Sequence, residues 1–297
     1  MTAHRDAPRL RVAVIGVGRV GSVLGAALAR AGHQVVAGTG VSRESVRRAA
    51  RLLPGVPLMP ADEAAGLADL VLLTVPDSQL PGLIQGLSAT SVWQPGQLAV
   101  HTCGAHGIEV FAPAAEIGVV GMALHPVMTF AGRDEDLLRL EGAAFGVTAP
   151  LEYRPIAETL VLELAGEPIW VPEQARAGYH AGLSMASNHL VTLVNDSLDV
   201  LRSAGVEDPV RLLAPLLNAS LDNALRLGDD ALTGPVSRGD RATVEAHLNA
   251  LQGTKFRKPY LAMALRTMQR AYASGRLSQQ QCADLIEGIE HAEGTGE

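Results

Sequence analysis

The chain has little of three residue types that often carry reactive or structural roles. Aromatic residues make up 3% of its 297 residues, so we expect a core built mostly of Ala, Leu and Val. Only Lys255 and Lys258 are lysines, which excludes most mechanisms that depend on a lysine amine. The two cysteines, Cys103 and Cys282, lack the spacing of a metal site and need not form a disulfide. The sequence therefore predicts no metal site.

Long apolar runs are absent as well. No run approaches the roughly 20 residues that cross a bilayer. The first ten residues, MTAHRDAPRL, contain no apolar stretch of the kind that a signal peptide requires. The formal net charge of −7 gives no reason to expect nucleic acid or an anionic membrane as a partner. We therefore expect a cytoplasmic globular protein.

The first half of the chain alternates short β-branched runs with helical stretches. This alternation predicts a parallel sheet covered by helices, the doubly wound α/β fold. The predicted strands are residues 12–15, 34–37, 70–75, 98–102, 119–123, 144–148 and 169–171. The first two helices are predicted over residues 22–30 and 43–53.

The pattern changes after Val171. Pro172 suits the first turn of a helix, and no further proline or strand-like run occurs until beyond Gly205. We predict one helix of about thirty residues here, a length that usually indicates an extended interface. Further helices are predicted over residues 209–227, 241–251, 259–274 and 278–290. The second half is therefore all-α, its boundary lies near Val171, and we expect a homodimer.

Three glycines, Gly16, Gly18 and Gly21, follow the first predicted strand and open the first helix. The first permits a tight turn, the second lets a pyrophosphate approach the backbone, and the third lets helix and strand pack closely. The helix N-terminus adds amide donors and a partial positive charge. We predict a Rossmann-type dinucleotide-binding domain over residues 1–171; the alternative is a glycine-rich turn without a ligand. The expected contacts are Gly16, Val17, Gly18, Arg19, Val20 and Gly21.

The end of the second predicted strand bears on the choice of cofactor. Sites that prefer NAD usually carry Asp or Glu there, which holds the ribose hydroxyls. This sequence has Ser42 and Arg43 instead, and a guanidinium can pair with a 2′-phosphate that a carboxylate would repel. We predict NADPH. The alternative is that Arg43 is only a solvated residue in the first turn of a helix.

Candidates for the nicotinamide end of the site follow the next strands. Ligands of such sheets bind at the carboxyl ends of the strands, where the sequence has Val75, Pro76, Thr102 and Cys103. His125 comes just after another predicted strand, and a near-neutral imidazole suits an acid or a hydrogen-bond donor in hydride transfer. The alternative is a structural histidine that bonds a loop carbonyl.

The long predicted helix carries polar residues on one face. His180, Ser184 and Asn188 are spaced four residues apart, and burying such a stripe is costly unless it meets a ligand or water. Helix–helix hydrogen bonds explain the stripe almost as well. Farther along, Arg238 lies in a rigid turn before Asp240, a predicted helix N-cap, and suits a substrate carboxylate or a cofactor phosphate.

Several segments together resemble one family: the glycine loop, TVPDSQL, HTCGA, LHPVMTF, YHAGLSMASN and ALTGPVSRGDRATVEAHL. Over essentially its whole length the chain is similar to Rossmann-like proteins with a helical C-terminal domain of formerly unknown function. The wider group includes 6-phosphogluconate dehydrogenase, pyrroline-5-carboxylate reductase and prephenate dehydrogenase. Some relatives are associated with an alternative type of ketopantoate reductase. The family is also often labelled as similar to deazaflavin-dependent NADP oxidoreductases.

This resemblance implies an NADPH-dependent oxidoreductase whose residues 172–297 bind substrate and form the dimer. The implied reaction reduces a small 2-keto acid, with 2-dehydropantoate to pantoate in pantothenate biosynthesis as the best candidate. The resemblance implies His125 as the polar group nearest the chemistry, and the polar stripe adds His180, Ser184 and Asn188 as catalytic candidates. We expect His125 and Asn188 to hold or protonate the carbonyl oxygen. Two departures from the family stand out: Cys103 replaces a usual serine, and the lysine of β-hydroxyacid dehydrogenases is replaced by Ser184. An imine or a prephenate-like substrate, and a non-catalytic NADP-binding protein, are the alternatives.

Overall fold

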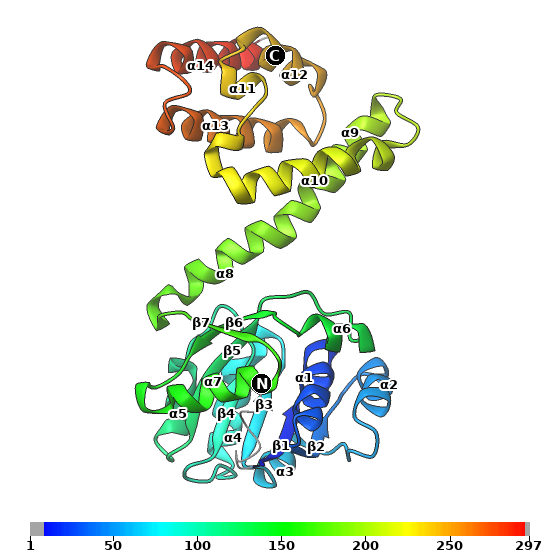
Figure 1. Cartoon of the computed structure of the whole chain (residues 1–297), viewed down its shortest axis with the longest axis vertical. Helices are drawn as coiled ribbons and strands as arrows, with labels where there is room; N and C mark the ends of the chain where they lie inside the picture. Colours follow the sequence, from blue (N-terminus) through cyan, green and yellow to red (C-terminus); the bar gives the residue numbers. More distant parts are fainter. Residues whose placement is uncertain (1–8, 295–297) are drawn as a thin grey trace. The chain divides into compact units, whose positions relative to one another are not determined.

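The computed structural model describes residues 9–294 of the chain. Within this range the chain forms two compact units, one reaching Ser187 and the other starting at Asn188. The described strands all lie in the first unit, whereas the described part of the second is helical (Figure 1). No helix in the described range is long and apolar enough to cross a membrane.

A seven-stranded sheet forms the centre of the first unit, in the order β2-β1-β3-β4-β5-β6-β7. The strands are β1 (Arg11–Ile15), β2 (Gln34–Thr39), β3 (Leu70–Leu73), β4 (Leu98–His101), β5 (Val120–Pro126), β6 (Ala144–Thr148) and β7 (Glu167–Trp170). The predicted doubly wound α/β fold is confirmed with one exception, because β6 runs antiparallel to β5. The reason lies in the connection: β6 starts at the edge of the sheet where β5 ends, so residues 127–143 need not cross back over it.

Helices cover both faces of this sheet. They are α1 (Arg19–Arg30), α2 (Arg43–Leu52), α3 (Ala61–Gly66), α4 (Leu80–Ala89), α5 (Ala112–Ala115), α6 (Asp134–Arg139) and α7 (Arg154–Glu163). Alternate side chains of β1 enter the two layers: Val12 and Val14 join the core under α1, α2 and α7, whereas Ala13 and Ile15 join the core under α3, α4 and α5. Because β1 is buried on both faces, its sequence is apolar at nearly every position.

The strand order changes direction between β1 and β3, since β2 lies on one side of β1 and β3 on the other. Ligands of open α/β sheets bind outside the carboxyl ends of the strands at such a point. The segments that follow β1, β3 and β4 therefore share the edge of the sheet where a dinucleotide is expected.

The long helix predicted after Val171 is confirmed over Arg176–Ser203, with one irregularity. It consists of α8 (Arg176–Ser184), a π-helical turn (Met185–His189) and α9 (Leu190–Ser203). The sheet ends at Trp170, close to the predicted boundary, whereas the first compact unit continues to Ser187. It continues because α8 packs on the sheet.

The second unit contains α10 (Pro209–Leu227), α11 (Pro235–Arg238), α12 (Arg241–Ala250), α13 (Arg257–Ala273) and α14 (Gln279–Gly294) beside α9. These bounds confirm the four helices predicted after residue 205. The apolar core of this unit lies between α12, α13 and α14. The predicted N-cap is also confirmed, because Asp240 accepts a hydrogen bond of 3.1 Å from the backbone N–H of Thr243.

Candidate functional site

The glycine loop has the geometry that its three glycines predict. Gly16 has φ +101°, a conformation that other residues rarely adopt. A Cβ on Gly21 would collide with the Gly16 carbonyl and with Oγ1 of Thr74. A Cβ on Gly18 would meet no atom nearer than 3.9 Å, so this glycine faces open space. The loop is therefore closed on the side of the sheet and open on the side where a pyrophosphate would lie.

The start of α1 is free to receive an anion. Gly18 is its N-cap, no side chain caps the helix, and its first turn contains no acidic residue. The first amides of the helix and its partial positive charge therefore face the open side of the loop. This arrangement fits the diphosphate of a dinucleotide.

The predicted loop residues do not all face this space. Val17 is fully buried in the core, and its backbone N–H donates to the Thr39 carbonyl at 2.8 Å. Val20 also packs against the core, whereas Arg19 is exposed. The side chains of Val17 and Val20 therefore pack toward the core and support the loop from that side.

The predicted 2′-phosphate residues lie at the start of α2. Ser42 caps this helix: its Oγ accepts from the Ser45 N–H at 3.0 Å, and the Ser45 side chain reciprocates. Arg43 is exposed at the first position of the helix. The hydroxyl of Ser42 therefore has a structural partner of its own, which leaves the guanidinium of Arg43 as the group free to meet a phosphate.

Further arginines line a hollow beside Arg43, and the sequence reasoning did not select them. This hollow is lined by Glu44, Arg47, Arg48, Arg51, Ala131, Gly132 and Arg133. Arg51 donates to the Gly132 carbonyl at 2.6 Å, which holds the loop after β5 against α2. The arginine-rich sequence of α2 was the available signal, but it cannot show that the loop after β5 adds Arg133 to the same hollow.

The segments after β3 and β4 lie along the same edge. Thr74 Oγ1 donates to the Gly16 carbonyl at 2.6 Å, which ties the β3 end to the glycine loop. Val75 and Thr102 are half-buried, and Pro76 is exposed.

Cys103, also predicted to contact the cofactor, is a core residue. It is almost fully buried, and this burial raises the pKa of its thiol to about 11. The thiol is therefore neutral and unsuited to act as a nucleophile near pH 7.

Two residues outside the predictions hold the loop after β4. His101 Nδ1 accepts from the Cys103 N–H at 3.2 Å, so its Nε2 carries the proton and donates to the Gly107 carbonyl at 2.8 Å. Glu173 accepts from the N–H groups of Ile108 and Glu109 at 2.7 and 3.1 Å. This loop is consequently fixed from β4 on one side and from the start of the long helix on the other.

His125 is the central polar group of this edge. The sequence placed it just after a strand, but it lies within β5, paired with Gly146, because β6 extends the pairing to Pro126. Its Nδ1 lies 2.8 Å from the hydroxyl of Tyr179 on α8. Burial, followed by electrostatic interactions with His180 and Arg176, lowers the pKa of His125 to about 4, so its ring is neutral near pH 7.

Tyr179 and His180 approach His125 from α8. A Cβ on Gly146 would collide with the Tyr179 hydroxyl, and a Cβ on Gly104 would collide with the His180 ring and lie 3.1 Å from His125 Nε2. The two glycines thus make room for this group of rings. Tyr179 is a further site residue that the sequence analysis did not select, because it lies beside the predicted polar stripe and not on it.

The predicted stripe of His180, Ser184 and Asn188 runs from α8 into a π-helical turn, Met185–His189, which contains Asn188. The role of the three residues in a common site stays a prediction. Ser184 is half-buried in the first unit, whereas Asn188 is exposed and begins the second. Arg238 lies in the second unit, exposed at the end of α11.

In the described residues, no group of three or more His, Cys, Asp and Glu side chains is arranged to hold a metal ion. The site is therefore a polar cluster at the carboxyl edge of the sheet, next to a loop that fits a dinucleotide.

Two family models match the chain. A Rossmann-like domain matches residues 2–126, and a domain of unknown function, DUF2520, matches residues 143–267. The chain therefore matches a Rossmann-like domain in its first part and the DUF2520 model in its second. The resemblance drawn from its motifs is thereby confirmed, whereas no curated protein matches the chain.

Solved structures share this fold at low identity. A protein described as an NADP oxidoreductase of Bacteroides fragilis is 21% identical with a TM-score of 0.73, covering 88% of this chain and 98% of its own. A reductive aminase of Aspergillus terreus, solved with NADPH and ethyl levulinate, is 17% identical with a TM-score of 0.64, covering 94% and 99%. A pyrroline-5-carboxylate reductase of Coxiella burnetii is 15% identical with a TM-score of 0.52, covering 90% and 98%. These similarities cover both the part that contains the sheet and the helical part, and they show that the fold is shared.

Burial of His101 and His125 predicts a stability that depends on pH. Burial is the largest cause that lowers each pKa from 6.5 to about 4. As the pH falls through this range the unfolded state takes up protons first, so the free energy of unfolding decreases, by on the order of 2–3 kcal/mol per histidine. Chemical denaturation at a series of pH values measures this slope.

His125→Asn should remove the contribution of this histidine to the pH dependence of the free energy of unfolding between pH 6.5 and 4. The exposed Leu138→Ala on α6 is the control for general effects of substitution. Parallel curves for wild type and His125→Asn would contradict the burial argument.

Proposed function

We propose that this Rossmann-like DUF2520 protein is an NADPH-dependent oxidoreductase that reduces a small 2-keto acid, with 2-dehydropantoate as the first substrate to test. The observation that carries the proposal is the His125–Tyr179 pair at the sheet edge that also holds the glycine loop. The choice of a keto acid rests on the resemblance to alternative ketopantoate reductases. The proposal keeps the cytoplasmic location expected from the sequence.

NADPH, when bound, supplies the hydride for the carbonyl carbon. The loop Gly16–Gly21 and the free start of α1 would hold its diphosphate, and Arg43 with the neighbouring arginines would hold the 2′-phosphate. The backbone after β3 and β4 would lie beside the nicotinamide end. The NADP oxidoreductase and the NADPH-bound reductive aminase that share the fold support this choice.

On the substrate side, neutral His125 would donate a hydrogen bond to the carbonyl oxygen while the oxygen gains negative charge. His180 and Ser184 stand on the same helix as Tyr179 and are candidates for further contacts. Asn188 and Arg238 belong to the second unit, and their roles toward the carbonyl oxygen and the carboxylate stay predictions from the sequence.

A C=N substrate is the second candidate, because the reductive aminase and the pyrroline-5-carboxylate reductase share the fold. An assay that follows NADPH absorbance with 2-dehydropantoate, other keto acids, cyclic imines and prephenate separates the candidates. We expect turnover with the keto acid and a loss of about 10²- to 10⁴-fold in kcat for His125→Asn. Turnover of imines alone would replace the proposed substrate, and NADPH binding without consumption of any substrate would refute catalysis.

The cofactor assignment predicts the effect of reversing one charge. Arg43→Glu should raise the KM for NADPH by about 10- to 100-fold, because a carboxylate repels the 2′-phosphate. The KM for NADH, which lacks that phosphate, should change little. The exposed Arg266→Glu on α13 is the charge-matched control. Equal effects on the two cofactors would contradict the role of Arg43.

We also propose that the protein is a homodimer joined through α9 and α10. Neither helix is covered within its own unit: α9 has no buried residue and α10 has only Pro209. Exposed apolar side chains of these helices include Val191, Leu193, Leu212, Leu216, Leu221 and Leu225. Apolar helix faces of this size mark interaction surfaces, and a second copy is the commonest partner.

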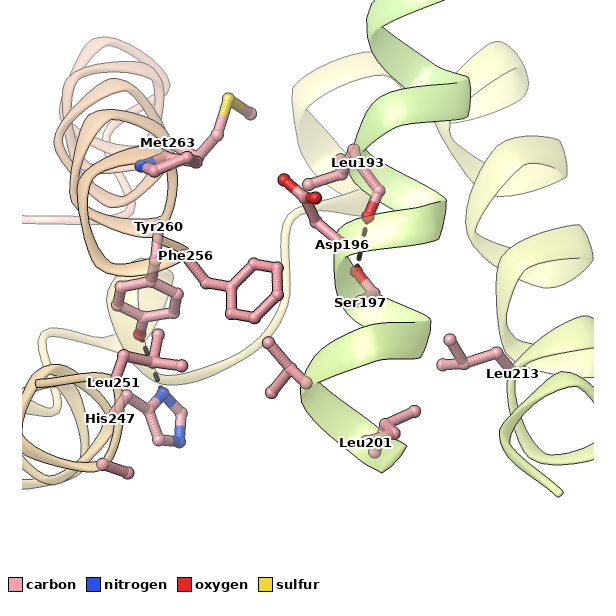
Figure 2. Close-up of a pocket in the computed structure, with 13 residues that line it drawn as sticks. Leu193, Asp196, Ser197, Leu201, Leu213, His247, Leu251, Phe256, Tyr260 and Met263 are labelled. Atoms are coloured by element: carbon pink, nitrogen blue, oxygen red, sulfur yellow. Dashed lines mark hydrogen bonds between the residues drawn. The ribbon is translucent and has the colours of Figure 1, made fainter. Parts of the chain in front are cut away.

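A groove beside these helices adds to the apolar surface. It has a volume of about 460 Å³ and lies between α9 and α10 on one side and α12 and α13 on the other. Figure 2 shows Leu193 and Ser197 of α9 facing Phe256 and Tyr260 across it. His247 bonds the Tyr260 hydroxyl at 2.8 Å at one wall, so the polar groups there are paired and the groove remains apolar.

The dimer is tested by light scattering coupled to chromatography. Wild type should have twice the chain mass, and Leu216→Glu should shift it to the monomer by burying a charge at the interface. Leu138→Glu, at an exposed leucine on α6 of the first unit, is the control and should stay dimeric. A monomeric wild type would refute this part of the proposal.

A further inference from the structure

Arg176 is a buried cation without a carboxylate partner. It is 2% exposed, and no described Asp or Glu lies within ion-pair distance. Its Nε donates to Thr148 Oγ1 at 2.8 Å, and its Nη2 donates to the carbonyls of Ala123 and Gly146 at 3.1 and 3.0 Å. Its Nη1 has no partner among the described residues. The guanidinium is thus solvated by neutral groups, and its charge is not cancelled by an ion pair.

Burying such a charge is unfavourable, so its position suggests a purpose beyond packing. The guanidinium carbon lies 5.7 Å from the ring centroid of Tyr179. Burial raises the pKa of Tyr179, whereas the charge of Arg176 and then the Gly146 backbone N–H lower it. The cation therefore stabilises negative charge on this phenol in particular.

The contact between Tyr179 and His125 can carry a proton. The Tyr179 hydroxyl lies 2.8 Å from His125 Nδ1, and in the relay this nitrogen accepts the hydroxyl hydrogen. A neutral His125 then carries its own hydrogen on Nε2, the atom beside Gly104. The imidazole consequently connects the phenol on one side with the open edge of the sheet on the other.

We propose that Tyr179 is the proton source of the reduction, acting through His125, and that Arg176 stabilises the resulting phenolate. This inference rests on the proposed oxidoreductase function. His125 alone cannot serve as the acid, because a neutral imidazole that lost its Nε2 proton would become an anion. A second proton arriving at Nδ1 removes that difficulty.

NADPH, when bound, would supply the hydride for the carbonyl carbon, and with it the two electrons that reduce the ketone. The carbonyl oxygen takes the Nε2 proton of His125, and Nδ1 takes the hydroxyl proton of Tyr179. Nε2 then regains a proton from solvent, and Nδ1 returns its proton to the phenolate, which restores both side chains.

Other charged or titratable groups surround this relay. They are Asp77, His101, Cys103, His106, Glu173 and His180. The carboxylate of Glu173 is occupied by two backbone N–H groups. Arg176 is the group whose positive charge acts directly on Tyr179.

The test measures the pKa of Tyr179 from the ultraviolet difference absorbance of tyrosinate as the pH is raised. Because the chain has four tyrosines, Tyr179→Phe shows which part of the absorbance change belongs to Tyr179. Arg176→Met should raise the pKa of Tyr179 by about one pH unit or more, because the stabilising charge is lost. Arg176→Lys, which keeps the charge, should hold the pKa near that of wild type. Thr148→Val, which removes a hydrogen-bond partner of Arg176 without removing charge, is the matched control and should also leave it in place.

An unchanged titration in Arg176→Met would overturn the relay, and so would an equal rise in Arg176→Lys. Should Arg176→Met not fold, a raised pKa of Tyr179 in Arg176→Lys would overturn the relay and an unchanged one would support it. In the reduction assay, Tyr179→Phe should lower kcat at least about 100-fold with little change in the KM for NADPH; a kcat near wild type would also overturn it. The titration needs neither cofactor nor substrate, so failure of wild type to reduce any compound would count against the proposed function alone.

Discussion

The antiparallel pairing of β5 with β6 is the constraint on which the polar site depends. It places Gly146 opposite His125, and the missing side chain of Gly146 leaves room for the Tyr179 hydroxyl. The same strands present the carbonyls of Ala123 and Gly146 that hold Arg176. A parallel β6 would change the register and direction of these groups, so neither the phenol nor the guanidinium would find its partners.

Polar contacts hold α8 to the sheet, and Arg176 is the buried residue of this helix. Arg176 joins it to β5 and β6, Tyr179 joins it to His125, and Glu173 joins the turn before it to the loop after β4. Hydrogen bonds to buried or charged groups are strong only while every partner is present. One set of contacts therefore fixes the helix, the loop and the orientation of the imidazole, so that structural and chemical roles coincide in the same residues.

Local sequence signals predicted much of the fold and part of the site. The glycine loop was readable because its backbone conformation requires glycine at fixed positions between a strand and a helix. Asp240 was readable as a cap because a cap acts within three residues. The structure places His125 at this edge, but its position within β5 was missed, since pairing with β6 is a contact distant in sequence. The π-helical turn after Ser184 was missed, because the four-residue spacing of the polar stripe carries no signal that separates an α-helix from one π-helical turn.

The sequence by itself determined the order of strands and helices, the glycine loop at the start of α1 and the missing acid at the end of β2, because each depends on neighbours a few residues apart. Only the tertiary structure decided the direction of β6, the burial of Cys103 and the meeting of His125 with Tyr179. Those features join residues more than twenty or even fifty positions apart, and burial of this kind has no local signature. The charge of Arg176 shows the difference: the sequence gives its sign, but only the fold removes the water that would otherwise screen it.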